Sequence, residues 1–303
     1  MVHHVIFPEV LRRVTGMDDD VVDLHEAVED GSLAEVVELA GCVADVDAEF
    51  EGRSALWVAV YEERHDVARA LVAAGADPWR PMMSGWSPGR LSLAGPDPDL
   101  FEWPAGARGP AELSEDEAAL VAEADRLTAV LGGVEHDGFS VACVAGIDAA
   151  EAVRRLEATV EVIDPEEFLD EIDPFAEESM RFVGVTDVPG GCVVSQPWGY
   201  VPAAPDAMRR LSTGTVCSAM YANPKSGDQG RVARDGEIVD WRLRPGGEPW
   251  EEDGPQEVLL SYLYQGNAVA YCCAYVGLRV ADERAVIGPP DVWLCLPERD
   301  HWT

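Results

Sequence analysis

The sequence predicts a mixed α and α/β fold, in which a short N-terminal stack of helices precedes an α+β domain built around a mainly antiparallel sheet. A motif recurs at spacings of 32 and 33 residues before residue 95. After residue 136, strand-like stretches follow one another and are joined by turn sequences. The 303 residues, 47% of them hydrophobic, are enough for about two domains, each with its own core.

These observations divide the chain into four parts. Residues 1–22 are expected to form an N-terminal cap segment, residues 23–95 the helical repeats, and residues 96–135 a linker and a bridging helix. Residues 136–303 are expected to form the α+β domain, whose function the sequence does not name.

The repeats are predicted from matching positions and from helical periodicity. Leu24 and Ala27 recur as Leu56 and Ala59, and Gly52 recurs as Gly85. In the second repeat, apolar residues recur at spacings of three, four and seven, which predicts one buried helical face. That face consists of Leu56, Ala59, Val60, Val67 and Leu71.

The residues from Gly52 to Ala59, "GRSALWVA", resemble the start of the ankyrin repeat family, G-x-T-P-L-H-x-A, and "GAD" from Gly75 resembles its end. The resemblance implies paired helices that present a concave protein-binding face. Trp57 replaces the usual histidine, and Gly89-Arg90 is expected to break the first helix of a third repeat. Because so few repeats need capping at both ends, the segment "VIFPEVLRRV" is a candidate cap.

The linker leads into a predicted helix from Ser114 to Leu131. Ser114 and Glu117 have the spacing of a capping box, and two glycines end the helix. We expect this helix to cap the stack or to bridge the two halves of the chain. Its apolar stripe is predicted from Leu120, Val121, Ala124, Leu127 and Leu131.

The second half alternates predicted strands and helices. A helix is expected from Asp148, which has an acidic residue three positions later, and two strands are expected around the turn Pro189-Gly190-Gly191. Asp235-Gly236 predicts a hairpin, and residues 255–278 are expected to be mostly helical. Stretches such as "PGGCVVSQPWGY" and "YANPK" resemble an uncharacterised domain that accompanies ankyrin repeats in high-GC bacterial proteins, and this resemblance implies no activity.

The composition limits the classes of function. A net charge of −35 opposes nucleic-acid and anionic membrane binding, and it favours association with a basic protein. No apolar run reaches the length of a membrane span, and the N-terminus lacks the order of a signal peptide. Seven cysteines in apolar runs without CxxC are typical of reduced core thiols, so we expect a cytoplasmic protein.

The sequence predicts no catalytic residues, no metal site and no cofactor. Cys192 and Ser195 lie on a predicted strand without a G-x-S-x-G elbow, and no histidine pair has metal-ligand spacing. The lone lysine, Lys225, lacks the context of a phosphate-binding loop. An enzymatic role is therefore not favoured by the sequence.

Candidate partner-binding residues come from two kinds of context. Trp86, Trp198 and Tyr200 lie near turns, and Lys225 is a rare positive charge in a loop. Nine acidic and no basic residues lie between Glu161 and Glu178, where a solvated arm, a docking surface for a basic partner and a calcium site are all open interpretations. The acidic candidates in this run are Asp164, Glu167, Asp170 and Glu171.

Two functional hypotheses follow from the sequence. The first is a cytoplasmic protein–protein interaction protein, with a narrower version in which an acidic inhibitor or immunity-type protein binds a basic toxin or enzyme. The alternative is a small-molecule or peptide-binding domain, with weak enzymatic activity, whose site lies near Trp198, Tyr200 and Lys225.

Overall fold

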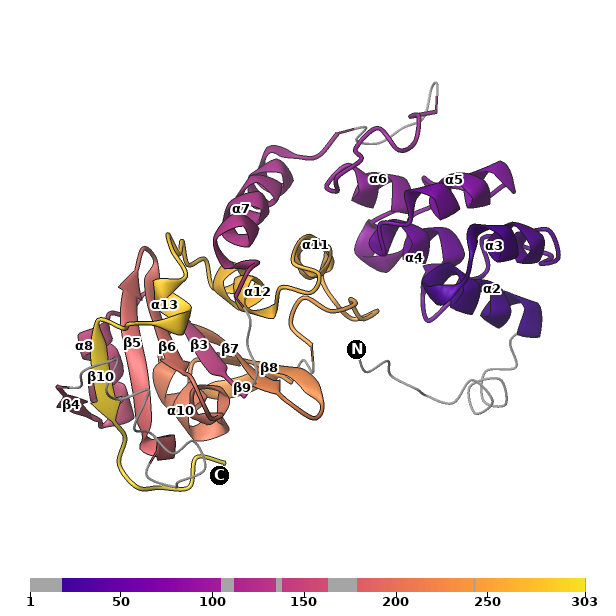
Figure 1. The fold of residues 1–303 in the computed structure, drawn as a ribbon. Coiled ribbons are helices and arrows are strands. Elements are labelled where there is room, and N and C mark those ends of the chain that lie inside the picture. The colour runs from indigo at the N-terminus through magenta and orange to yellow at the C-terminus, as the bar shows by residue number, and fades with distance from the viewer. Residues whose placement is uncertain (1–17, 105–111, 135–137, 163–178, 242–243, 303) are drawn as a thin grey trace. The chain divides into compact units, whose positions relative to one another are not determined.

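The chain folds into two compact units (Figure 1). The first contains Met1–Val121 and Pro249–Leu263, and the second contains Ala122–Glu248 and Tyr264–Thr303. The structure is a computed structural model that describes residues 18–104, 112–134, 138–162, 179–241 and 244–302. Most of the expected cap segment, residues 1–17, lies outside the described residues.

The first unit consists mainly of short helices, and the serines of the repeat begin them. Ser54 Oγ accepts a hydrogen bond of 3.2 Å from the backbone N–H of Trp57, and Ser87 Oγ accepts an equal one from Arg90. The elements are α2 (Asp19–Asp30), α3 (Leu33–Ala40), β1 (Glu49–Phe50), β2 (Arg53–Ser54), α4 (Ala55–Tyr61), α5 (His65–Ala73), η1 (Met83–Gly85) and α6 (Pro88–Ser92).

The first helix of the third repeat forms as α6, contrary to the expectation that Gly89-Arg90 breaks it. Both residues lie inside α6. A Cβ at Gly89 would lie 2.8 Å from the carbonyl oxygen of Pro78 and from the ring of Trp79. Glycine is therefore present because the backbone of α6 packs closely on the preceding loop, and the helix tolerates it.

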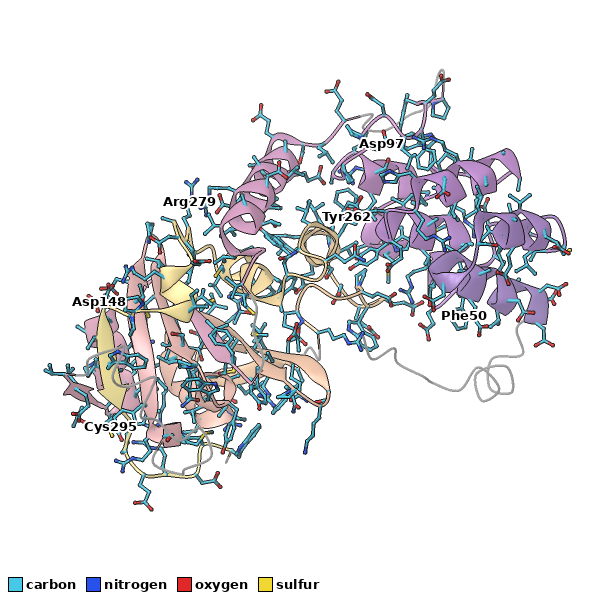
Figure 2. All side chains as sticks on the ribbon, viewed as in Figure 1. Phe50, Asp97, Asp148, Tyr262, Arg279 and Cys295 are labelled. Atoms are coloured by element: carbon cyan, nitrogen blue, oxygen red, sulfur yellow. The ribbon has the colours of Figure 1, made fainter. Side chains whose placement is uncertain are left out.

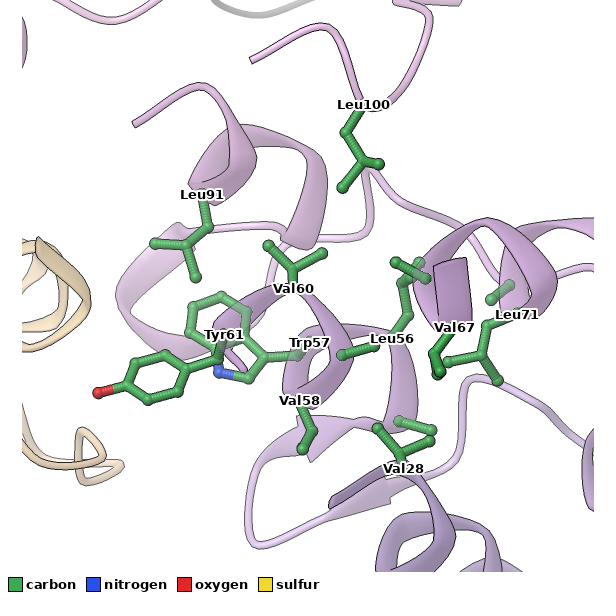
Figure 3. Close-up of a cluster of buried hydrophobic side chains, with 14 of the residues drawn as sticks. Val28, Leu56, Trp57, Val58, Val60, Tyr61, Val67, Leu71, Leu91 and Leu100 are labelled. Carbon is green, nitrogen blue, oxygen red and sulfur yellow. The ribbon is translucent and has the colours of Figure 1, made fainter. Parts of the chain in front are cut away.

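The predicted apolar face of the second repeat is confirmed. Leu56, Val60, Val67 and Leu71 are fully buried in one core, together with Ala59 from the same face. Figure 3 shows these side chains of α4 and α5 gathered with Val28 of α2. Trp57, in the position where the ankyrin motif has histidine, is also fully buried.

A segment from far along the chain completes the first unit. Helix α11 (Pro255–Leu263) buries Val258 and Leu259 in the same core as Leu56. The hydroxyl of Tyr61 on α4 donates a hydrogen bond of 3.1 Å to the carbonyl oxygen of Ser261. In Figure 3, Tyr61 points away from Leu71, toward the tan ribbon. The sequence assigns this stretch to the α+β domain, whereas in the structure α11 packs on α4 in the core of the first unit.

Helix α7 (Glu115–Leu131) confirms the predicted capping box. The N–H of Glu117 donates to Ser114 Oγ at 3.2 Å, and the N–H of Ser114 donates to Glu117 Oε2 at 2.8 Å. Leu127 and Leu131 of the predicted stripe are buried. The helix begins in the first unit and ends in the second.

The second unit contains one eight-stranded antiparallel sheet, so the chain has a mixed α+β fold. Neighbouring strands follow the order β4-β10-β5-β6-β3-β7-β8-β9. The predicted hairpin at Asp235-Gly236 joins β8 to β9, and both turn residues have positive φ. The strands are β3 (Ser140–Ala145), β4 (Thr159–Glu161), β5 (Phe182–Val188), β6 (Gly191–Gln196), β7 (Val216–Asn223), β8 (Gly227–Arg234), β9 (Glu237–Asp240) and β10 (Val292–Cys295).

Alternation along the strands separates the two faces of the sheet. Ala142 and Val144 of β3 join a core with residues of helices α8 (Ala149–Leu156) and α10 (Pro205–Leu211). Cys143, on the other face, lies 3.5 Å, sulfur to sulfur, from Cys273 of α12 (Ala268–Tyr275). The predicted helix after Asp148 is confirmed as α8, and residues 255–278 are broken into α11 and α12. The remaining helical elements are α8 (Ala149–Leu156), η2 (Ser179–Arg181), η3 (Val201–Ala203), α10 (Pro205–Leu211), α12 (Ala268–Tyr275) and α13 (Arg284–Ile287).

Candidate functional site

The residues proposed from sequence as partner contacts do not form one site. Trp86 is only 1% exposed, and its Nε1–H donates a hydrogen bond of 2.8 Å to the carbonyl oxygen of Pro255. It therefore offers no ring surface to a partner, contrary to the expectation from its turn context. The acidic candidates Asp164, Glu167, Asp170 and Glu171 lie outside the described residues.

The other candidates lie in the second unit. Trp198 and Tyr200 are half-buried in the loop after β6, and Lys225 is exposed in the turn between β7 and β8. The backbone N–H of Lys225 donates to Asn223 Oδ1 at 2.9 Å, which fixes this turn. Of these three residues, Tyr200 belongs to an aromatic cluster that the structure assembles.

The loop that carries Tyr200 is clamped by a buried amide. Gln196 Nε2 donates to the carbonyl oxygens of Met180 and Phe182, each at 3.0 Å, and its Oε1 accepts from the N–H of Val201 at 3.0 Å. Gly199 has a φ of 135°, and a Cβ there would lie 2.5 Å from Gln196 Oε1. The clamp therefore holds Tyr200 on a rigid turn.

Three further aromatic rings and one guanidinium lie close together around Tyr200. The ring centroid of Tyr200 lies 5.0 Å from that of Trp302, and Arg231 Cζ lies 5.1 Å from the Trp302 ring. Arg231 Cζ also lies 4.9 Å from the ring of Trp241. Tyr221 meets Tyr200 edge to face at 6.3 Å. We call these five residues the arginine–aromatic cluster.

Strand register and the chain end bring the cluster together. Arg231 on β8 pairs with Ala219 on β7, which places Arg231 and Tyr221 on the same face of the sheet. The C-terminal segment reaches this face because the N–H of Asp206 donates to the carbonyl oxygen of His301 at 3.1 Å. Arg299 also pairs with Glu157 at 2.6 Å.

Arg231 is held without a carboxylate partner among the described residues. Its Nη1–H donates to the carbonyl oxygen of Ala203 at 2.6 Å, and its Nε is buried without a hydrogen-bond partner there. Burial lowers the pKa of the guanidinium. The two indole faces offset part of that desolvation through cation–π attraction.

The outer rings of the cluster are open to solvent. Trp241 is 56% exposed and Trp302 is 47% exposed. Both indole rings therefore present a large apolar surface to solvent. The cluster thus combines two exposed rigid rings with a fixed positive group close to both. Such an arrangement can bind a partner surface or a flat ligand.

The two nucleophile candidates from the sequence lie elsewhere in the second unit. Cys192 and Ser195 are both buried in β6. Burial raises the pKa of the Cys192 thiol to about 12, with the carboxylates of Asp187 and Asp148 adding to the effect. The thiolate is therefore scarce at neutral pH, and both side chains are shielded from solvent.

The sequence reasoning missed four members of the cluster. The signals were present, since a tryptophan follows a hairpin strand and another lies near the C-terminal end. Nothing in the sequence says that these segments, far apart along the chain, meet at one arginine. The missed members are Tyr221, Arg231, Trp241 and Trp302.

In the part of the chain that the structure describes, no group of three or more metal-ligating side chains is placed to hold an ion. Within the same ranges, no helix has the length and apolar content needed to span a membrane. Comparison with protein-family models and with curated proteins finds no match to this chain.

Proposed function

We propose that the chain is a protein–protein interaction protein that binds its partner through the arginine–aromatic cluster. The observation that carries this proposal is the pair of exposed tryptophans, Trp241 and Trp302, whose rings lie 4.9 and 5.1 Å from Arg231 Cζ. Tryptophan, tyrosine and arginine dominate binding hot spots, because rigid rings bury much surface and lose little conformational entropy.

The proposed partner is a basic protein in the cytoplasm. A net charge of −35 attracts basic proteins over long distances and speeds their association, while the rings of the cluster supply short-range affinity. The ankyrin-like repeats and the free, largely buried cysteines also support an intracellular binding role. A narrower form of the proposal is an inhibitor or immunity-type protein directed at a basic toxin or enzyme.

The test compares matched tryptophan variants. Trp302→Ala and Trp241→Ala remove the exposed rings, and Trp250→Ala removes a ring that is 59% exposed in the first unit. We expect affinity capture followed by mass spectrometry to recover a basic protein with the wild type and with Trp250→Ala. Removing a hot-spot ring costs about 2 kcal/mol, so recovery should fall at least tenfold with Trp302→Ala.

Two results would overturn the proposal. One is capture of an acidic protein or a nucleic acid as the specific partner. The other is equal recovery with the wild type and with both cluster variants, since the partner would then bind outside the cluster.

A small carboxylate ligand is a second candidate for the same cluster. The observation that favours it is Arg231, whose guanidinium has no carboxylate partner in the described ranges and lies about 5 Å from each of two flat rings. Titration with indole-3-acetate, monitored by isothermal titration calorimetry, tests it. Saturable binding of indole-3-acetate that is lost in Arg231→Lys would support this function over protein binding. The absence of any binding signal in the wild type would show that the cluster does not bind this carboxylate.

A further inference from the structure

The first unit contains a groove that neither the repeats nor the proposed function uses. It has a volume of about 310 Å³, at the lower end of the range for ligand sites. One side is formed by helix α5 and the other by the segment after α6. Its lining residues are Arg69, Val72, Pro78, Leu100, Phe101 and Glu102.

The segment that forms the second wall is fixed in place. Leu100 is buried in the core of the unit, and its N–H donates to the carbonyl oxygen of Asp97 at 3.1 Å. Asp97, labelled in Figure 2, pairs with Arg69 of α5 at 2.6 Å. The wall is therefore tied both to the core and to the opposite helix.

A pair of indoles secures the far end of this wall. Trp79 Nε1–H donates to the carbonyl oxygen of Glu102 at 3.1 Å, and the Trp79 ring meets that of Trp103 edge to face at 4.6 Å. The groove is thus preformed, so a ligand need not order a loop in order to bind there.

The groove lies on a different side of the repeats from α11. Helix α11 covers the face of α4 that carries Tyr61, whereas the groove is formed by Arg69 and Val72 of α5. The covered face offers no docking surface to a partner chain. The groove stays accessible, with Val72, Pro78 and Phe101 half-buried.

The charge left at the groove is negative. The guanidinium of Arg69 is already paired with Asp97. Glu102, which lines the groove, is exposed, and its carboxylate has no cationic partner among the described residues. An apolar floor beside an uncompensated carboxylate is complementary to an apolar side chain with a flanking cation.

We propose that this groove binds a short basic peptide segment of a partner protein. One aliphatic side chain lies against Val72, Leu100 and Phe101, and a flanking lysine or arginine pairs with Glu102. The small volume suits a single side chain with its adjacent backbone. This site is independent of the arginine–aromatic cluster, which lies in the other unit.

The test uses the full chain, labelled with ¹³C in the valine and leucine methyl groups, and observed by NMR during titration with acetyl-Lys-Leu-Lys-amide. We expect the methyl resonances of Val72 and Leu100 to shift. The matched peptides acetyl-Glu-Leu-Glu-amide and acetyl-Lys-Ser-Lys-amide should bind at least threefold more weakly, because each lacks one of the two complementary features.

Variants localise the binding. Val72→Phe fills the groove and should lower the affinity for the peptide at least tenfold. Val37→Phe, at an exposed position of α3, should leave that affinity unchanged. Glu102→Gln removes the charge without altering the shape of the groove. We expect its affinity for the peptide to be about threefold lower than that of Glu38→Gln. Equal binding of the acidic peptide, shifts that avoid Val72 and Leu100, or equal effects of Glu102→Gln and Glu38→Gln would each overturn the proposal.

Discussion

At the scale of single residues, His25 gives the first unit a dependence on pH. The side chain is 3% exposed on α2, and its Nε2–H lies 3.4 Å from the carbonyl oxygen of Ala48. Burial lowers the pKa of the imidazole to about 4, and nearby Arg53 adds to the effect. The folded state therefore favours the neutral ring, while the unfolded state takes up a proton near pH 6.5.

The contribution of His25 to the free energy of unfolding is therefore lost as the pH falls from about 6.5 toward 4. At pH 5 the two pKa values predict a loss of about 2 kcal/mol relative to pH 7. Urea denaturation of the wild type and of His25→Gln at both pH values isolates this loss, because titration of the other groups is common to both proteins. We expect His25→Gln to show a smaller loss between the same two pH values, and an equal loss in both proteins would contradict the prediction.

Single residues also show how far sequence reasoning extends at the candidate site. Tyr200 was identified from its position after a strand, and the structure includes it in the cluster. Trp86 shares that turn context, yet it is buried because its indole N–H reaches the backbone of Pro255. Exposure depends on which remote segment covers a side chain, and one sequence without a fold does not contain that information.

At the scale of elements, α11 is expected to be essential for the first unit. Leu259 is fully buried in the core shared with α4, so Leu259→Ala should lower the free energy of unfolding by about 2–5 kcal/mol. Leu33→Ala, at a position of α3 that is 40% exposed, should have an effect below about 0.5 kcal/mol.

Hydrogen exchange of the α4 amides measures both effects in the full chain. Faster exchange is expected in Leu259→Ala than in Leu33→Ala, because α11 packs directly on α4. If α4 stays equally protected in the two variants, then α11 is not part of the cooperative unit.

The elements themselves were largely predictable, because their signals are local. The capping box at Ser114, the helix after Asp148 and the hairpin at Asp235-Gly236 each depend on neighbouring residues, and each is confirmed. The expected helical stretch over residues 255–278 is instead divided near Gly266, where φ is 71°. The assignment of its first part to the repeats depends on packing between remote segments, which periodicity does not reveal.

At the scale of the whole molecule, net charge is expected to oppose folding. With −35 charges at pH 7, self-repulsion destabilises the compact state. Raising sodium chloride from about 0.01 to 0.1 M shortens the Debye length from about 30 to 10 Å, and the melting temperature should rise by a few degrees. The gain should be smaller at pH 5, where fewer carboxylates are ionised. A melting temperature that falls or stays constant with salt at pH 7 would contradict this prediction.

Residues 249–263 belong to the first unit although most of the second unit precedes them in the sequence. This order affects how the protein folds during synthesis and how its gene can recombine. About 160 residues separate the last repeat helix, α6, from α11, and a ribosome adding roughly 5–20 residues per second needs about 8–32 s to make them. During that interval the nascent repeats lack α11 and expose its apolar contact surface, so they are potential clients of chaperones. A gene exchange that moved only the first 121 codons would also leave this helix behind. The two units are therefore expected to be inherited together.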